Sequence, residues 1–109
     1  MTAKVFAELS GFKTVCMPSP EKNVDGVYIG DLLSWVMGRA EQGNVWITIM
    51  SNLNIVAVAT LADTSVILLA EGVEADESLV DVANSKGVNI LSTSLSSYEA
   101  AIKVNELLR

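Results

Sequence analysis

Residues 26–40 contain a short strand, a tight glycine turn and a helix in direct succession. The strand ends with the run Val27-Tyr28-Ile29, the turn is at Gly30, and the helix is expected to run from Asp31 to about Ala40. Asp31 is the predicted N-cap, because a carboxylate accepts hydrogen bonds from the free N–H groups of a first helical turn and suits its positive end. Strand–turn–helix units of this kind build sheets whose strands are mainly parallel.

The same order recurs along the rest of the chain. The predicted elements are helix 2–9, strands 12–17 and 24–29, helix 31–40, strand 45–49, helix 52–62, strand 65–70, helix 76–86, strand 88–93 and helix 97–108. We therefore expect one α/β domain over residues 1–109, with a mainly parallel five-stranded sheet and helices on both faces. Local signals support three of the helix ends: Thr2 as a cap, Gly87 as a stop, and Ser96 with Glu99 as a capping box.

Segment 52–62 fits two structures. Its residues 55–59 are rich in β-branched side chains and alternate, which is compatible with a strand. We favour a helix, because Ser51 or Asn52 can cap one and because the apolar run continues to Ala62. A strand also follows at once, at residues 65–70, and its continuous apolar character predicts burial on both faces.

The charge of the chain excludes several kinds of partner. Seven Lys and Arg residues face 13 Asp and Glu residues, which gives a net charge of −6 without a basic stripe, so we expect no binding to nucleic acid or to anionic membranes. Residues 43–62 carry no charge, but Ser51, Asn52 and Asn54 lie in their middle, where polar groups are costly in lipid. The first residues show no signal-peptide pattern, and we expect a cytoplasmic protein.

The apolar content predicts a subunit interface. Half of the residues are apolar and the mean hydropathy is +0.42, and a small domain commonly places surplus apolar residues between subunits. The predicted helix 31–40 is apolar on most sides and is therefore expected to be covered on most sides. Trp35 and Met37 are its candidate interface residues, with a core position as the alternative for Trp35, whereas Trp46 is expected in the core.

Residue types needed for common catalytic sites are missing from the sequence. The chain has no histidine, one cysteine and no Gly-Lys-Ser/Thr sequence, which excludes histidine-based catalytic sets, histidine zinc sites, an iron–sulfur cluster held by this chain and a P-loop. We expect no enzymatic activity, no metal and no cofactor. Cys16 is predicted to be a buried free thiol, and the acidic residues between positions 71 and 81 a solvated helix start.

Polar residues at the predicted carboxyl ends of strands remain as candidates for binding a ligand or a partner. Open α/β sheets bind ligands at that edge. The candidates are Gly30, Asp31, Thr48, Ser51, Asn52 and Asn54. Their hydroxyl and amide groups suit a nucleotide or a partner backbone, although Asp31 would repel phosphate. Turn geometry and helix capping explain the same residues structurally.

Three stretches carry a family resemblance that spans nearly the whole chain. They are residues 26–31, the strand Trp46-Ile47-Thr48 with residues 52–59, and residues 87–93 followed by Tyr98-Glu99. In this order they resemble a DRTGG domain. The Asp-Arg-Thr-Gly-Gly string that names the family is absent, and the middle turn has the sequence Glu71-Gly72-Val73-Glu74-Ala75-Asp76 instead. The resemblance implies an α/β fold similar to the N-terminal domain of bacterial HPr kinase.

The same resemblance implies a regulatory function. DRTGG domains are accessory modules that accompany CBS pairs, some inorganic pyrophosphatases and phosphotransacetylases, and they often help to form dimers. Stand-alone copies like this one resemble small proteins found beside iron-only hydrogenase components in anaerobic bacteria. The implied function is a non-catalytic regulatory or scaffold module that forms a homodimer and acts through protein contact, with a hydrogenase subunit as a partner. The alternative is a sensor domain for an adenine nucleotide.

Overall fold

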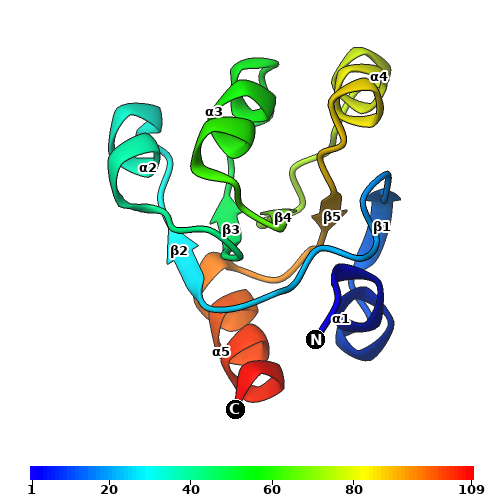
Figure 1. Ribbon diagram of the computed structural model, residues 1–109. Helices are drawn as coiled ribbons and strands as arrows, with labels where there is room; N and C mark the ends of the chain where they lie inside the picture. Colours follow the sequence, from blue (N-terminus) through cyan, green and yellow to red (C-terminus); the bar gives the residue numbers. More distant parts are fainter.

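The computed structural model describes residues 1–109 and consists of one central sheet with helices on both faces (Figure 1). Helices and strands alternate in the order expected from the sequence. The elements are α1 (Ala3–Ser10), β1 (Lys13–Cys16), β2 (Val27–Ile29), α2 (Leu33–Arg39), β3 (Val45–Thr48), α3 (Asn54–Ala62), β4 (Val66–Leu69), α4 (Glu77–Lys86), β5 (Ile90–Ser92) and α5 (Ser97–Leu108). None of the helices combines the length and the apolar character needed to cross a bilayer.

The sheet has the strand order β1-β5-β4-β3-β2. Neighbouring strands from β2 to β5 are parallel, and β1 pairs antiparallel with β5. All four residues of β3 and of β4 are buried, because these strands lie in the middle of the sheet with helices on both sides. The predicted mainly parallel five-stranded sheet and the buried strand at 65–70 are therefore confirmed.

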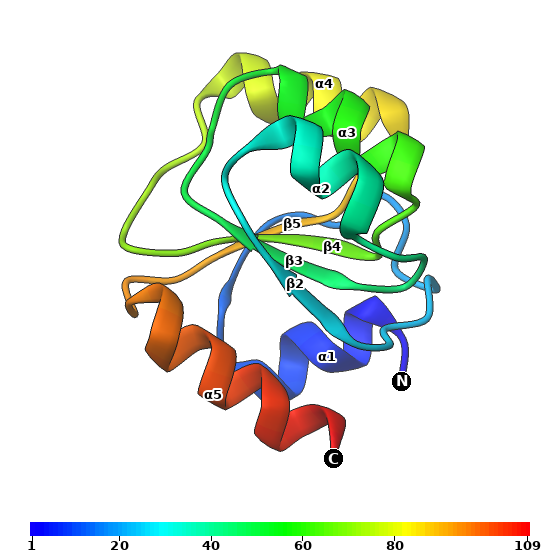
Figure 2. The same ribbon diagram turned by 90° about the vertical axis from the view of Figure 1, so that its left-hand side faces the viewer.

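The sheet separates the core into two halves, and a layer of helices covers each half (Figure 2). Helices α2, α3 and α4 cover one face, where Trp46 and Ile67 are fully buried. Helices α1 and α5 cover the other face, which receives Ile47 and Leu68. The alternation of side chains along β3 and β4 thus supplies both cores from consecutive residues, because successive strand residues point to opposite faces. Trp46 occupies the predicted core position.

Most predicted helix ends are found in the structure. Thr2 Oγ1 accepts from the Val5 N–H at 3.2 Å, and Ser96 and Glu99 form the expected capping box at the start of α5. Gly87 ends α4 in the left-handed conformation, with φ of 73°. Segment 52–62 is helical, as favoured from the sequence, and forms α3 from Asn54 to Ala62. The cap or stop at each of these helix ends is formed by residues that are close together in the chain, which is why the sequence could predict them.

The prediction for the start of α2 was wrong. Asp31 is not an N-cap, because α2 begins at Leu33 and the residue before it, Leu32, caps nothing with its side chain. At α3, Asn52, one of the two residues expected to cap the helix, accepts with its Oδ1 from the N–H of Asn54 at 2.9 Å, and Leu53 between them already has helical backbone angles. α2 thus begins without a side-chain cap, and tertiary packing takes the place of the local signal that the sequence offered.

Within the chain itself, α2 is covered on one side only. Val36 is the one buried residue of this helix. The helix spans only seven residues and lies above β2, the last strand of the sheet, so it has a neighbouring helix, α3, on one side only (Figures 1 and 2). Its apolar side chains therefore face solvent where the sheet ends.

Candidate functional site

Asp31 joins the carboxyl ends of β2 and β3. Its Oδ1 atom accepts from the Thr48 hydroxyl at 2.8 Å and from the Ile49 N–H at 2.9 Å. The Thr48 Oγ1 atom in turn accepts from the Met50 N–H at 3.2 Å. Two of the predicted site residues, Asp31 and Thr48, therefore meet in space, and the carboxylate caps the end of a neighbouring strand instead of its own helix. The Oδ2 atom has no partner within the chain.

Gly30 completes this corner of the sheet. Its carbonyl accepts from the buried Trp46 indole Nε1–H at 2.9 Å, and its N–H donates to the Ile47 carbonyl at 3.2 Å. The ring of Tyr28 lies over the glycine, so that a Cβ atom at position 30 would come within 2.9 Å of the Tyr28 ring. Gly30 is therefore required for close packing, and its polar groups are already used within the fold.

The remaining polar candidates lie in the β3–α3 turn. Asn52 is exposed, and its Oδ1 accepts from the Asn54 N–H at 2.9 Å, a local turn contact. Ser51 is half-buried and Asn54 is exposed, and neither side chain has a hydrogen-bond partner in the chain. The side chains of Ser51 and Asn54 are thus free to bind, and none of the three side chains joins the hydrogen bonds of Asp31 and Thr48.

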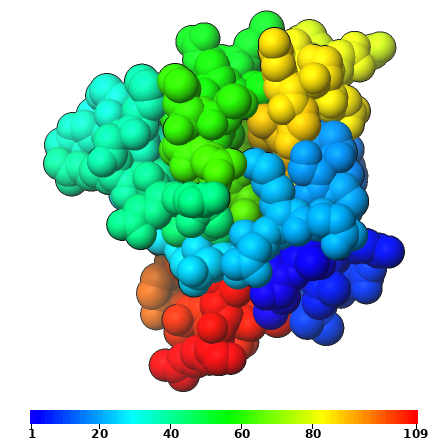
Figure 3. Space-filling view, viewed as in Figure 1, coloured from blue at the N-terminus to red at the C-terminus, as the bar shows by residue number.

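The exposed side chains of Leu32, Trp35 and Met37 form what we call the α2 surface. They are 59%, 53% and 48% exposed, respectively. Ile29 is also half-exposed, but it lies beside Ile47 on the other face of the sheet, which α1 and α5 cover. The guanidinium carbon of Arg39 lies 3.8 Å from the centroid of the Trp35 ring, so a cation–π contact holds the ring on the outside of the helix. The structure thus excludes the core position that the sequence left open for Trp35. In the space-filling view, α2 projects from one side of the molecule (Figure 3).

The other helix starts at the carboxyl edge are occupied by carboxylates of the chain itself. Asp76 Oδ1 accepts from the Leu79 N–H at 2.8 Å at the start of α4, and the Leu79 N–H and the Ser78 hydroxyl lower the pKa of Asp76 below its ordinary value. Glu71, in a left-handed backbone conformation with φ of 61°, accepts from the Ser97 N–H at 3.0 Å at the start of α5. A phosphate at this edge would therefore meet negative charge where α/β proteins commonly offer free N–H groups.

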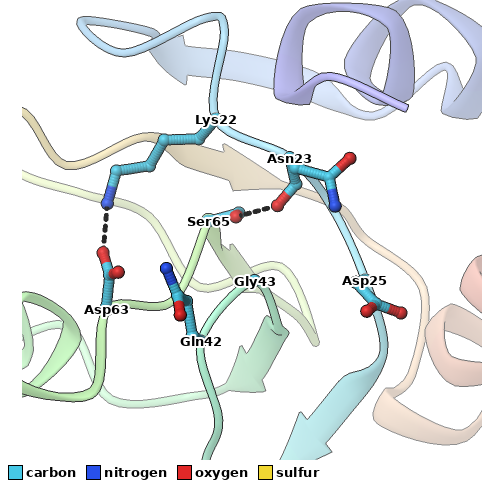
Figure 4. A pocket seen from close by; sticks show the side chains of 7 residues that line it. All are labelled: Lys22, Asn23, Asp25, Gln42, Gly43, Asp63 and Ser65. Carbon is cyan, nitrogen blue, oxygen red and sulfur yellow. Dashed lines mark hydrogen bonds and ion pairs between the residues drawn. The ribbon is translucent and has the colours of Figure 1, made fainter.

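A polar pocket of about 360 Å³ lies at the opposite edge, where β2, β3 and β4 begin (Figure 4). Its lining residues are all hydrophilic or glycine: Lys22, Asn23, Asp25, Gln42, Gly43, Asp63 and Ser65. Lys22 Nζ forms an ion pair with Asp63 Oδ1 at 2.9 Å, and the Ser65 hydroxyl donates to the Asn23 carbonyl. The pocket holds two carboxylates and one ammonium that is already paired, a poor match for phosphate groups.

Cysteine and acidic residues form no further site. Cys16 is buried, and burial raises the pKa of its thiol above the ordinary value. Its Sγ lies 3.5 Å from the Val88 carbonyl, as expected for a cysteine that packs as a small apolar residue. No three or more Cys, Asp or Glu side chains are arranged to hold a metal ion.

Sequence reasoning missed the exposure of Ile29 and Leu32, which lie on opposite faces of the sheet. Ile29 ends a predicted strand and Leu32 was placed inside an apolar helix, and both patterns are those of core residues. The position of β2 at the end of the sheet exposes them, and strand order cannot be seen in a run of residues. The available signal was the surplus of apolar residues in segment 27–37 over what one short helix can bury.

The fold and these surfaces define a small α/β domain with an exposed apolar helix and with its polar strand ends already hydrogen-bonded. The model of the DRTGG domain family matches residues 5–107, and the chain therefore belongs to this family.

The DRTGG fold is also found in solved structures. The crystal structure of the CBS and DRTGG domains of the regulatory region of Clostridium perfringens pyrophosphatase, in complex with the activator diadenosine tetraphosphate, matches with a TM-score of 0.69 at 12% sequence identity. The match covers 90% of this chain and 43% of that chain, and at this identity it shows a shared fold. No curated protein matches this chain in sequence.

Proposed function

We propose that this DRTGG domain is a non-catalytic regulatory or scaffold module that forms a homodimer and acts through protein–protein contact at the α2 surface. The observation that carries the proposal is the exposure of three large apolar side chains, Leu32, Trp35 and Met37, on and just before one short helix of a single small domain. Exposed groups of this kind, with an aromatic residue among them, are typical of protein contact sites. Asp31, Gly30 and Thr48 form hydrogen bonds within the chain. These bonds favour a structural role for the three residues over a role in binding a ligand.

Sedimentation velocity of the pure chain over a range of concentrations tests this proposal. We expect a reversible dimer whose dissociation constant rises roughly ten- to thirty-fold in Trp35→Ala and less in Met37→Ala, because aromatic anchors dominate contact energies. Tyr98→Ala is the matched control, since Tyr98 is 75% exposed on α5, in the other helix layer. Equal dissociation constants for Trp35→Ala, Tyr98→Ala and the wild type would exclude the α2 surface as the contact site.

For the partner beyond a second copy, we propose an iron-only hydrogenase component. The support is the resemblance of this DRTGG domain to stand-alone copies found beside such components. Co-elution of the tagged chain with a purified hydrogenase component, lost in Trp35→Ala and kept in Tyr98→Ala, is the expected result. Failure of the wild type to co-elute would remove this partner and leave the homodimer unaffected.

A sensor domain for an adenine nucleotide is the second candidate. It is favoured by the likeness to a regulatory region whose activator is diadenosine tetraphosphate. Asp31, Glu71 and Asp76 at the carboxyl edge oppose it, because each places a carboxylate where phosphates would bind. Thermal unfolding with a panel of adenine nucleotides distinguishes the two candidates. A ligand at about 100 times its dissociation constant adds roughly 2.7 kcal/mol and should raise the midpoint by about 10 °C, whereas the contact module shows no shift.

A further inference from the structure

The chain leaves β4 and β5 toward opposite faces of the sheet. β4 leads through residues 70–76 to α4, which covers one face, and β5 leads through residues 93–96 to α5, which covers the other (Figure 2). The two strands are parallel neighbours and end at the same edge. Open α/β sheets bind ligands in the crevice outside the carboxyl ends of two such strands. No other pair of parallel neighbours has this arrangement, because α2, α3 and α4 follow β2, β3 and β4 on one face.

Two adjoining pockets lie at this crevice and share Lys13, Glu74 and Ser92. The larger, of about 310 Å³, is otherwise lined by Thr14, Val15, Ala75 and Val80. The smaller, of about 190 Å³, is otherwise lined by Gly72, Val73, Thr93 and Ser94. Lys13, at the start of β1, pairs antiparallel with Ser92, at the end of β5, which brings the lysine to the carboxyl edge. We call the two pockets together the β4–β5 cleft.

The cleft holds one cation and one anion that are not paired. The Lys13 ammonium and the Glu74 carboxylate line both pockets, yet they form no ion pair with one another or with any other residue, since the one ion pair of the chain joins Lys22 and Asp63. Neither side chain has a hydrogen-bond partner in the chain. Both charges are therefore available to a molecule in the cleft.

Glu74 is the one carboxylate of the β4–α4 turn without a structural partner. Glu71 accepts from the Ser97 N–H at the start of α5, and Asp76 accepts from the Leu79 N–H at the start of α4. These two carboxylates hold the walls of the crevice in place. Glu74 contributes nothing of this kind, and it lines the cleft between them in sequence.

The lining of the cleft indicates the chemical class of its ligand. Two unpaired charges of opposite sign match a zwitterion, whose ammonium binds a carboxylate and whose carboxylate binds an ammonium. The apolar side chains of Val15, Ala75 and Val80 in the larger pocket suit a short aliphatic group. No aromatic ring lines either pocket, so the cleft offers no stacking surface for a nucleobase.

We propose that the β4–β5 cleft binds a free α-amino acid with a short aliphatic side chain. The Lys13 ammonium binds the carboxylate of the ligand, the Glu74 carboxylate binds its ammonium, and Val15 and Val80 contact its side chain. The cleft lies beside β1 and β5, whereas the α2 surface lies beside β2 at the other end of the sheet. The site therefore goes beyond the proposed protein contact and supplies the regulatory module with a small-molecule effector.

Titration of the isotope-labelled chain with L-alanine, L-valine and L-leucine, followed by two-dimensional NMR, tests the site. We expect saturable shifts of the amide signals of Gly72, Glu74, Ser92 and Ser94, with a dissociation constant of about 1 mM or less. Each amino acid has analogues that lack one charge: for L-valine, isovalerate lacks the ammonium and isobutylamine lacks the carboxylate. Each analogue should bind roughly ten-fold more weakly than its amino acid, because one charged contact is lost.

Two substitutions test the assigned contacts. Lys13→Met and Glu74→Gln should each raise the dissociation constant of the amino acid roughly ten-fold. Lys103→Met and Glu77→Gln are the matched controls, since both residues are exposed on helices and lie outside the cleft, and they should bind like the wild type. The spectrum of each variant without ligand reports whether it is folded.

The site is overturned if none of the three amino acids gives a saturable shift at about 10 mM, or if the shifts centre on residues outside the cleft. Equal binding of L-valine and isovalerate, or an unchanged dissociation constant in Glu74→Gln, overturns the zwitterion as the ligand class. Trp35→Ala should bind the amino acid as the wild type does, so this test stands apart from that of the homodimer.

Discussion

At the scale of single residues, Asp31 links the carboxyl ends of two neighbouring strands. One carboxylate oxygen holds the Thr48 hydroxyl and the Ile49 N–H, and it thereby fixes the path of the chain after β2 and after β3. Because α2 and the β3–α3 turn both start from this point, Asp31 positions the base of the α2 surface without itself belonging to that surface. Its role is therefore tertiary, although its place before a helix suggested a local one.

Replacing Asp31 with Ala should lower the free energy of unfolding by about 1–2 kcal/mol, because two donors lose their shared acceptor. Urea denaturation measures the change, and Asp81→Ala, at an exposed position of α4, should stay within about 0.5 kcal/mol of the wild type. A double-mutant cycle with Thr48→Val then isolates the contact. Additive effects of Asp31→Ala and Thr48→Val would show that the pair is not coupled.

The Asp76 carboxylate makes stability depend on pH. Hydrogen bonds from the Leu79 N–H and the Ser78 hydroxyl hold its pKa in the folded chain below the ordinary value of 3.8. The folded state therefore binds the proton less readily than the unfolded state. This contribution to stability is complete above the ordinary value and is lost as the pH falls through the lower, folded value. We expect Asp76→Asn to flatten the pH dependence of the unfolding midpoint below about pH 5. If the unfolding midpoints of the mutant and the wild type fall equally with pH below about pH 5, this assignment is contradicted.

At the scale of elements, α5 and α2 show opposite ways of starting a helix. The first N–H groups of α5 are held by Ser96, by the reciprocal contact of Glu99 and by Glu71 from the β4–α4 turn. α2 starts after Leu32 with no side-chain cap, and one of its residues is buried. The stability of α5 is therefore local in part, whereas α2 depends on its packing against α3 and on whatever covers its outer face.

The capping box of α5 can be tested directly. Ser96→Ala should cost about 1 kcal/mol in the free energy of unfolding, because the Glu99 N–H loses its acceptor. Ser94→Ala, two residues earlier at an exposed position without a side-chain hydrogen bond, should have almost no effect. Chemical denaturation of the two variants side by side gives the comparison, and equal losses would mean that the hydroxyl of Ser96 does not act as a cap.

At the scale of the whole molecule, the central strands are closed to water on both faces, whereas the edge strands β1 and β2 are only partly covered. The consecutive residues of β3 and β4 supply two cores, and the helix layers cover both. The α2 surface, beside the β2 edge, is the apolar area that we propose is buried in a dimer. Association at that place should therefore stabilise the fold itself.

The unfolding midpoint should rise with protein concentration, since a dimer that forms only from folded chains is stabilised by mass action. Differential scanning calorimetry over about a hundred-fold range of concentration measures the rise. For Trp35→Ala the midpoint should become nearly independent of concentration, while Tyr98→Ala should behave like the wild type. A midpoint that does not move in the wild type would contradict a dimer in that concentration range.

The sequence by itself determined the features that depend on near neighbours in the chain. The alternation of strands and helices, the caps at Thr2 and Ser96, the stop at Gly87 and the buried positions of Trp46 and Cys16 all follow from periodicity or from groups a few residues apart. Element bounds shifted by one to three residues, because strands end where the neighbouring strand ends. Family membership was readable in the same way, from an ordered set of local patterns.

Only the tertiary structure decided where Asp31 and Trp35 act. Asp31 binds a backbone group 18 residues further along the chain, and the Trp46 indole binds a carbonyl 16 residues back, so strand order and not local sequence brings these partners together. The sequence pattern of an apolar helix is the same whether the helix is covered by other elements or exposed to solvent. The place of β2 at the end of the sheet leaves α2 uncovered on its outer side, and that place is set by how all five strands pair.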